Sequence, residues 1–494
     1  MAAAPIVLTL VSAALYSLAF PPLSFSALAW VALVPLFVAA ATVPPRRAAA
    51  CGMLWGVALG VGVGWCLPGM LDRYFGLSPL VGWAALVAVG IGHAGIYVAV
   101  FAAWLSWLAR RGAGPLAIAA GWGVCEFARS RLLIGNPWAL LGYSQVGVSP
   151  VMQLADVAGP YGVGVLVAAA NAALAGILSP ALRPRRPFAA LAAVAAALAA
   201  SLVYGEWRLG QTFASGEPLA VTIVQGAVER AFRWQPEYRT LGLDRYVALT
   251  EAAAPPAPGL VVWPENAVDF YLQDPSAERD TLLGAARGLR SDLILGGPSY
   301  AYGPAGIRYH NSVWLVRAGR LAGRYDKVRL VPFAEASALA AGGRFEPGRG
   351  VHTLRAGPAR VGAFVCFEAM YPELVRRFAQ GGAEVLANLS NDAWFGSGAP
   401  AEHHLRIASV RAIENRRYLL RATTTGISAV IDPYGRIVAR SRFGAPAVLR
   451  ETIRASRVQT PYQRWGDSAA WLAVAFALAS TLWHARAAVV PQRR

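Results

Sequence analysis

The sequence has almost no lysine. Of its 45 basic residues, 44 are arginine and one, Lys327, is lysine. Arginine carries a wide, planar guanidinium that stays charged, whereas lysine carries a compact ammonium that fits a narrow pocket and changes its pKa on burial. Because the chain uses arginine everywhere else, the ammonium of Lys327 indicates a chemical role. The alternative is a lysine that survived by drift at a solvated strand end.

Charged residues of both signs are scarce. Only 15% of the 494 residues are charged and 56% are hydrophobic, whereas an average globular chain is about 25% charged and about 45–50% apolar. The net charge is +18, of which residues 206–467 contribute +8 and the apolar remainder +10. In that remainder arginine lies at the ends of apolar segments, where orientation signals and lipid phosphates account for it. The charge therefore does not predict a nucleic-acid partner.

Cysteine is scarce as well and forms no metal-binding pattern. The four cysteines are Cys51, Cys66, Cys125 and Cys366, without a CxxC pair or a Cys/His ligand spacing. The first three lie in apolar segments, where cysteine behaves as a small hydrophobic residue. Cys366 lies alone in the more polar part of the chain. We therefore expect a free thiol there and no metal site.

Long apolar runs, in contrast, are abundant. A helix that crosses a bilayer needs roughly 20 mostly apolar residues. Eight candidate spans occur, at residues 5–20, 24–42, 49–68, 78–108, 113–128, 157–180, 187–205 and 468–485. We therefore expect a membrane domain of seven helices over residues 1–205, a soluble domain over residues 206–467, and a last membrane helix with a short tail over residues 468–494.

Arginine in the short loops predicts the orientation of these spans. The loops after the even-numbered spans contain ten arginines, and the opposite short loops contain three. Loops rich in lysine or arginine remain in the cytoplasm. Both termini are therefore expected in the cytoplasm, with residues 206–467 on the outer side of the membrane.

Small and charged residues inside the spans make further predictions. A glycine at every fourth position of the third span predicts close helix packing; these are Gly52, Gly56, Gly60 and Gly64. Glu126 and Arg129 lie one helical turn apart in the fifth span. Polar groups at such depth are candidates for a functional role, and an ion pair that stabilises the helix end is the alternative.

Residues 206–467 alternate short β-branched runs with helical stretches. Strands are predicted at residues 221–225, 259–263, 293–297, 312–316, 320–325, 359–365, 384–389 and 421–431, and helices at 239–254, 277–288, 372–380 and 403–417. This alternation predicts an α/β sheet whose faces are covered by helices. Active sites in such folds lie at the carboxyl ends of strands.

Three residues suited to catalysis follow predicted strands: Glu265, Lys327 and Cys366. A thiol near a helix N-terminus and a cation has a lowered pKa, which predicts a nucleophile at Cys366. Glu265 would then be the general base, and Lys327 with the backbone N–H after the cysteine would stabilise an oxyanion. The alternatives are a core cysteine and a glutamate that caps a turn.

The order of these three residues and their surroundings resembles the nitrilase (carbon–nitrogen hydrolase) superfamily. The matching pieces are Trp263-Pro264-Glu265-Asn266, Tyr325-Asp326-Lys327 and Cys366-Phe367-Glu368. Further matching segments lie at residues 137–145, 224–226, 310–312, 330–335, 388–396 and 460–467. With apolar spans on either side, nearly the full chain resembles the membrane-integrated branch of that superfamily, the apolipoprotein N-acyltransferases.

The resemblance implies a fold, a reaction and a location. The fold is an eight-span helical bundle with a soluble α-β-β-α sandwich. The reaction moves an acyl chain from a phospholipid, typically phosphatidylethanolamine, to Cys366, and then to the α-amine of a diacylglyceryl-cysteine at a lipoprotein N-terminus. No cofactor is implied. The location is the bacterial inner membrane, with the catalytic domain on the periplasmic side.

The resemblance also implies roles for residues around the site. Glu335 would orient Lys327, and Glu368 would support the site. Trp234 and Asn311 occupy positions that the family uses around its pocket. A lipid substrate also favours exposed Trp394 and Phe395, and the stretch 334–343, in loops that dip into the membrane interface. The alternative is that they are ordinary core and arm residues.

Two other functions are compatible with these sequence features. A membrane-tethered amidase or nitrilase would use the same three residues with water as the acceptor. A non-catalytic membrane scaffold would carry the soluble domain as a relic. Acyl release without a lipoprotein acceptor would favour the first, and a harmless Cys366→Ala substitution in cells would favour the second.

Overall fold

The structure is a computed structural model. It describes residues 3–112, 114–133, 135–184, 186–228, 239–254, 256, 258–304, 306–332, 334–335 and 345–489. The chain divides into two compact units, which we call the helical unit (Met1–Gly210 with Trp465–Arg494) and the α/β unit (Gln211–Arg464).

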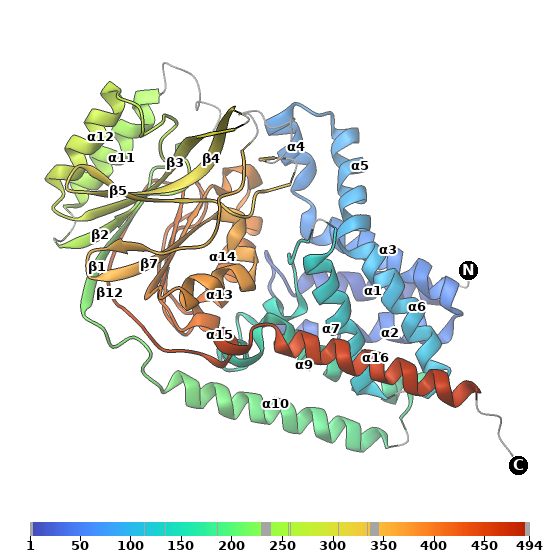
Figure 1. The fold of residues 1–494 in the computed structure, drawn as a ribbon. Helices are drawn as coiled ribbons and strands as arrows, with labels where there is room; N and C mark the ends of the chain where they lie inside the picture. The colour runs from blue at the N-terminus through green and yellow to red at the C-terminus, as the bar shows by residue number, and fades with distance from the viewer. Residues whose placement is uncertain are drawn as a thin grey trace, which may run out of the picture. The chain divides into compact units, whose positions relative to one another are not determined.

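The helical unit is built from apolar helices (Figure 1). They are α1 (Ala3–Leu18), α2 (Val34–Thr42), α3 (Pro45–Gly64), α4 (Leu67–Phe75), α5 (Pro79–Gly90), α6 (Ile96–Ala109), α7 (Pro115–Arg131), α8 (Ser149–Met152), α9 (Ala155–Leu178), α10 (Pro187–Leu209) and α16 (Ser468–Val489). A π-helical turn, Ile91–Gly95, joins α5 to α6. Proline stands in the first turn of α2, α3, α4, α5, α7, α8 and α10. Proline suits that position because its missing N–H would have no partner there.

Within the described residues, five helical segments are long and apolar enough to cross a membrane. They are Pro45–Gly64, Pro79–Ala109, Ala155–Leu178, Pro187–Leu209 and Ser468–Arg486, and they match five of the eight predicted spans. The other three predicted spans are shorter. The first is the 16-residue α1, the second is a 3₁₀ turn (Ser26–Trp30) followed by the nine-residue α2, and the fifth is the 17-residue α7. The bundle of eight spans therefore stays a prediction.

Close packing of α3 against the α5–α6 helix is confirmed. A Cβ on Gly52, Gly56 or Gly60 would come within 2.2–2.7 Å of backbone atoms of that helix. At Gly64 the nearest atom would be a side-chain carbon at 3.1 Å. The first three glycines are therefore needed for the helices to approach each other.

Glu126 and Arg129 form a buried ion pair in α7, with 3.3 Å between Arg129 Nη2 and Glu126 Oε1. The same carboxylate oxygen accepts hydrogen bonds from the Tyr16 hydroxyl at 3.1 Å and the Leu141 backbone N–H at 2.7 Å. The pair thus connects α7 to α1 and to the segment that follows residue 138. These contacts fit the alternative interpretation, an ion pair that stabilises the end of the helix. A functional role for the pair stays a prediction.

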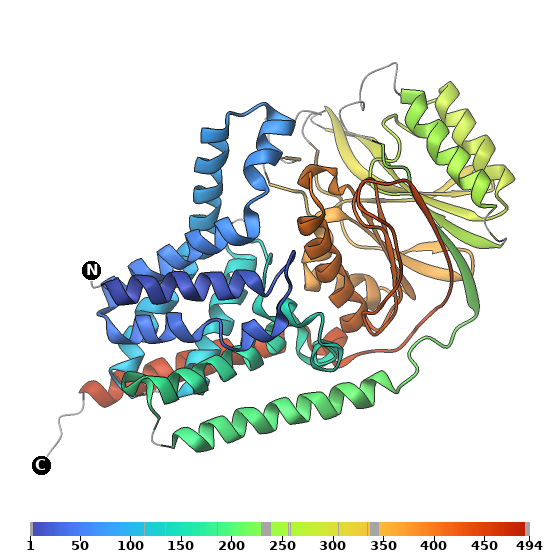
Figure 2. The ribbon, with the colours of Figure 1, turned by 180° about the vertical axis from the view of Figure 1, so that it is seen from behind.

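The α/β unit consists of two six-stranded sheets, with strand orders β12-β1-β2-β3-β4-β5 and β11-β10-β9-β8-β7-β6. The strands are β1 (Pro218–Gln225), β2 (Gly259–Val262), β3 (Asp292–Gly303), β4 (Gly306–Arg317), β5 (Arg320–Asp326), β6 (Leu354–Ala356), β7 (Ala359–Val365), β8 (Val385–Ser390), β9 (Leu419–Thr423), β10 (Ala429–Ile431), β11 (Ile437–Arg440) and β12 (Ala447–Arg454). Helices α11 (Arg239–Ala253) and α12 (Ala277–Gly288) cover the first sheet. Helices α13 (Pro372–Gln380) and α14 (Gly398–Asn415) cover the second, and α15 (Pro461–Trp465) follows β12 (Figures 1 and 2).

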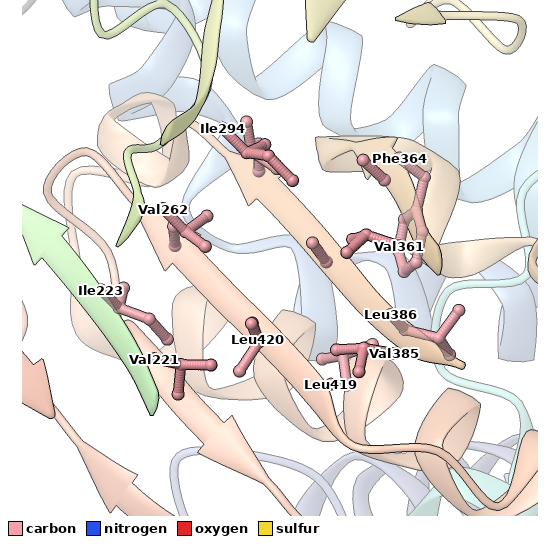
Figure 3. Close-up of a cluster of buried hydrophobic side chains, with 14 of the residues drawn as sticks. Val221, Ile223, Val262, Ile294, Val361, Phe364, Val385, Leu386, Leu419 and Leu420 are labelled. Atoms are coloured by element: carbon pink, nitrogen blue, oxygen red, sulfur yellow. The ribbon is translucent and has the colours of Figure 1, made fainter. Parts of the chain in front are cut away.

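The core lies mainly between the two sheets. Figure 3 shows Ile223 and Val262 of the first sheet among side chains of the second, such as Leu420. The neighbouring residues Val261 and Trp263 point the other way and pack under α11 and α12. Because both faces of these strands are covered, they read as continuous apolar runs. The predicted α-β-β-α sandwich is confirmed.

Several elements differ from the prediction: β3 and β4 are longer than predicted, and β6, β11 and β12 were not predicted. The stretch 421–431 is two strands, β9 and β10, because the chain turns at Gly426, where a Cβ would lie 2.5 Å from the side chain of Asp392. Helix α14 begins at Gly398, five residues before the predicted start, since Pro400 is tolerated in a first helical turn.

Candidate active site

The three predicted catalytic residues lie at carboxyl ends of strands. Strands β2 and β3 are parallel, and β4 is antiparallel to both β3 and β5, so β2 and β5 run in the same direction. Glu265 follows β2 and Lys327 directly follows β5 at that edge of the first sheet. Cys366 directly follows β7 of the second sheet.

Lys327 is buried between two carboxylates. Its Nζ lies 3.4 Å from Oε1 of Glu265 and 2.8 Å from Oε2 of Glu335, and the lysine is 1% exposed. Burial alone would lower the pKa of the ammonium, but the charges of Glu335 and Glu265 outweigh burial and raise it above its usual value. The only lysine of the chain is therefore a fixed positive charge. Its expected contact with Glu335 is present, and the orienting role of Glu335 stays a prediction.

Asn311 of β4 lies inside this charged cluster. Its Nδ2 donates hydrogen bonds to Oε1 of Glu265 at 2.7 Å and to Oε1 of Glu335 at 2.8 Å. The second carboxylate oxygen of Glu265, Oε2, is buried and has no hydrogen-bond partner among the described residues. Glu265 therefore has one oxygen held in place and one available to take a proton.

The segment that carries Glu265 lies directly on β3, at a glycine. A Cβ on Gly296 would approach the Glu265 Cα to 2.5 Å and the Pro264 carbonyl oxygen to 2.7 Å, and the Gly296 N–H donates to that same carbonyl at 3.0 Å. We did not predict this role from the sequence. The available signal was the Gly296-Gly297 pair inside the strand predicted at residues 293–297, since glycine within a strand marks a close backbone approach.

Cys366 occupies a sharp turn between β7 and a short 3₁₀ helix, Cys366–Met370. Its φ of 48° lies in the left-handed region, which non-glycine residues seldom adopt and which is typical of strained functional positions. Burial raises the pKa of this half-buried thiol to about 12; the charge of Glu265 adds to the rise, and Lys327 opposes it.

The predicted lowering of the thiol pKa is therefore wrong. The 3₁₀ helix, and not the longer α13, begins at Cys366, so the thiol does not lie at the N-terminus of an α-helix. Burial and the Glu265 carboxylate then outweigh the single cation. The thiol is neutral at rest and depends on a base to become a nucleophile.

Glu368 connects the segment of Lys327 to that of Cys366. Its carboxylate is fully buried and accepts four hydrogen bonds. Oε1 accepts from the Tyr325 hydroxyl (2.8 Å) and from the backbone N–H groups of Val328 (2.7 Å) and Arg329 (3.0 Å), and Oε2 accepts from the N–H of Val365 (2.7 Å). Burial raises the pKa of Glu368 although these donors oppose the rise. The carboxylate thus holds the ends of β5 and β7 together.

The predicted substrate contacts are less clearly defined. Trp234 and residues 336–344 lie outside the described part of the chain. Trp394 and Phe395 belong to a 3₁₀ helix (Asp392–Phe395) and are half-buried, and Phe395 packs against the core and the ring of His404. The two side chains are therefore less exposed than predicted, because Phe395 packs against the core. Contact with lipid stays a prediction for both.

A glutamate, a lysine and a cysteine at strand ends of a four-layer sandwich define a carbon–nitrogen hydrolase. Residues 220–463 match the carbon-nitrogen hydrolase family, and residues 12–173 match the family of apolipoprotein N-acyltransferase N-terminal domains. A crystal structure of Saccharomyces cerevisiae Nit3, of the nitrilase superfamily, covers 49% of this chain and 92% of its own at 21% identity, with a TM-score of 0.40.

Two relatives match nearly the full length. The apolipoprotein N-acyltransferase of Geobacter metallireducens is 34% identical over 490 residues, which cover 95% of this chain and 93% of that protein. The apolipoprotein N-acyltransferase of Methylococcus capsulatus is 33% identical over 485 residues, which cover 93% of this chain and 92% of that protein. The chain belongs to the apolipoprotein N-acyltransferase family.

Proposed function

We propose that this protein transfers an acyl chain from a phospholipid to the α-amine of an N-terminal diacylglyceryl-cysteine of a lipoprotein, through a thioester on Cys366. The observation that carries the proposal is that Oε2 of Glu265 is buried and has no hydrogen-bond partner among the described residues, while Lys327 and Asn311 hold the other oxygen. The charge of that carboxylate raises the pKa of the Cys366 thiol, so a neutral nucleophile that needs a base stands near a carboxylate that can act as one.

In the first half-reaction, Oε2 of Glu265 takes the thiol proton and Sγ of Cys366 attacks the ester carbonyl of the phospholipid. The carbonyl oxygen becomes an oxyanion, which the fixed charge of Lys327 and the backbone N–H of Phe367 stabilise. The tetrahedral intermediate collapses as the C–O bond breaks. Glu265 returns its proton to the departing alkoxide, so a lysophospholipid leaves and a thioester remains.

In the second half-reaction, the free amine attacks the thioester carbonyl. Glu265 takes a proton from the attacking nitrogen and gives it to Sγ when the C–S bond breaks. The products are an amide and the neutral thiol of Cys366. Because the pKa of Cys366 is raised to about 12, the thiolate takes the proton readily and the enzyme returns to its resting state.

The composition of the chain supports a membrane location for this reaction. We assign eight membrane spans in residues 1–205 and 468–494, both termini to the cytoplasm, and residues 206–467 to the periplasmic side of a bacterial inner membrane. The acyl donor is phosphatidylethanolamine, and no cofactor takes part. The side chains that contact lipid are Trp234, Trp394 and Phe395. The supports are the arginine-rich loops on one side of the spans and the five apolar helices.

Acceptor dependence tests the proposal against hydrolysis. The purified protein is incubated with phosphatidylethanolamine and either a diacylated lipopeptide with a free N-terminal amine or the same lipopeptide N-acetylated. We expect lysophospholipid to accumulate beyond one molecule per protein only with the free amine, and not to form with Cys366→Ser. Equal release of fatty acid and lysophospholipid without any amine would instead assign a hydrolase.

A further inference from the structure

A buried polar cluster outside the catalytic residues contacts the backbone of the nucleophile. The carbonyl oxygen of Cys366 lies 3.3 Å from Nε2 of His404 on α14 and 3.4 Å from Nδ2 of Asn388 on β8. Both side chains are almost completely buried, at 2% and 0% exposed. Neither residue has a role in the mechanism above, so their convergence on one backbone carbonyl needs a reason.

The partners of His404 define which ring nitrogen carries the proton. A carbonyl only accepts hydrogen bonds, so Nε2 must be the donor. Nδ1 lies 3.0 Å from both Nη2 of Arg421 and Oδ1 of Asp392. Burial, together with the charge of Arg421, lowers the pKa of His404. Nε2 is therefore the donor to the carbonyl, and Nδ1 lies between the Arg421 guanidinium and the Asp392 carboxylate.

Arg421 also orients the other donor. It hydrogen-bonds Oδ1 of Asn388, so the amide nitrogen of Asn388 must face the Cys366 carbonyl. Nη2 of the same guanidinium donates to Oδ2 of Asp392 at 2.7 Å, and Ser390 donates to Oδ1 at 2.8 Å. Every member of the cluster is thus held by another member, and two fixed donors act on one carbonyl.

The Cys366 carbonyl belongs to the same peptide unit as the N–H of Phe367. A peptide unit is planar and trans, so its C=O and N–H point in opposite directions. We propose that His404 and Asn388, held by Arg421 and Asp392, are positioning residues that aim the Phe367 N–H at the oxyanion. Donors on the carbonyl also polarise the peptide and make its N–H a stronger donor. This inference rests on the proposed function and concerns the same site.

A matched pair of substitutions tests the inference. His404→Gln places an amide nitrogen near the position of Nε2 and keeps the donor. His404→Asn is one carbon shorter and withdraws it, while both variants keep a neutral polar side chain. The same substitution at the neighbouring buried histidine, His403→Asn, is the control for damage to α14.

The primary measurement is the single-turnover rate at which phosphatidylethanolamine acylates Cys366. Removal of an oxyanion donor typically lowers the rate by about 10²–10³. In His404→Asn the Phe367 N–H is kept but poorly oriented, so we expect the acylation rate to fall by roughly tenfold or more. The phospholipid concentration at half-maximal rate should not change. His404→Gln should stay within about threefold of the unsubstituted protein, and His403→Asn should lose less than His404→Asn.

A spectroscopic measurement separates positioning from folding. With a ¹³C-labelled acyl carbonyl, the infrared stretch of the thioester reports the hydrogen bonds to its oxygen. We expect that stretch to move to higher frequency in His404→Asn and not in His404→Gln. Equal rates for His404→Asn and the unsubstituted protein, equal losses in His404→Gln and His404→Asn, or an unshifted stretch would each overturn the inference. A thioester that fails to form in the unsubstituted protein would overturn the proposed function itself.

Discussion

At the scale of single residues, the charge on Glu265 decides when the thiol of Cys366 reacts. The carboxylate is one of the causes that raise the pKa of that thiol to about 12, after burial. Within the described part of the chain, one of its oxygens has no hydrogen-bond partner and could accept the thiol proton. In the proposed mechanism, the same carboxylate keeps the resting thiol neutral and serves as the base that activates it.

Glu265→Gln should separate these two effects. Removing the negative charge lowers the pKa of Cys366, because the thiolate is no longer repelled by a neighbouring carboxylate. At a fixed pH below about 12 the thiolate fraction rises, and Cys366 should react faster with iodoacetamide. Acyl transfer should fall by about 10²–10⁴ because the general base is gone. Peptide mass spectrometry across pH gives the alkylation rate, with Cys51 and Cys125 as internal references. Slower alkylation in the variant would contradict this account of the thiol.

Glu368 makes a prediction about stability. Its carboxylate accepts four hydrogen bonds without any exposure to solvent. In Glu368→Ala these donors are left unpaired, at about 1–3 kcal/mol for each buried group. We expect the free energy of unfolding to fall by at least about 3 kcal/mol, measured by denaturant unfolding with tryptophan fluorescence. As a control, Glu217→Ala removes an exposed glutamate of the same unit. It should change the free energy of unfolding by less than about 0.5 kcal/mol. Equal effects of the two substitutions would contradict the connecting role of Glu368.

At the scale of elements, the position of the base depends on how closely its segment lies on β3. Gly296→Ala would place a methyl group 2.5 Å from the Cα of Glu265, so one of the two segments must shift. A displacement of about 1 Å at a catalytic group is worth about 10²-fold in rate. We expect a loss of that order in Cys366 acylation, measured in a single turnover.

Gly284→Ala is the control for this prediction. Gly284 lies in α12, and a Cβ there would meet no atom within 4 Å among the described residues. Alanine favours a helix over glycine by about 1 kcal/mol, so this variant should keep its acylation rate and unfold at an equal or higher temperature. Full activity in Gly296→Ala would show that the segment of Glu265 tolerates the shift.

The elements differ in how far the sequence alone predicts them. The buried strands were predictable because both of their faces are covered, so they read as apolar β-branched runs such as Leu260-Val261-Val262. Glu265 and Cys366 were predictable because each follows such a run, and Lys327 because it is the only lysine of the chain. The hydrogen bonds of Glu368 and the contact of His404 were not predictable, since both side chains act on backbone groups that no local pattern marks. The lowered thiol pKa was wrong for the same reason, because burial is a property of the folded chain.

At the scale of the whole molecule, the distribution of arginine makes a prediction about topology. Ten arginines in one set of short loops against three in the other predict that the termini lie in the cytoplasm. Alkaline phosphatase, which is active only outside the cytoplasmic membrane, should be active when fused after Gly210. Green fluorescent protein, which folds in the cytoplasm, should fluoresce when fused after Arg494. The reverse pattern would contradict the predicted orientation.

The central claim is that Cys366 carries an acyl group between two lipid substrates. Intact-mass spectrometry after incubation with phosphatidylethanolamine tests it most directly, with Cys366→Ser as the control. The account predicts one added acyl mass on the unsubstituted protein, removed by hydroxylamine and by a diacylated lipopeptide with a free amine, but not by water at a comparable rate. An adduct that water discharges as fast as the lipopeptide, or no adduct on Cys366, would contradict it.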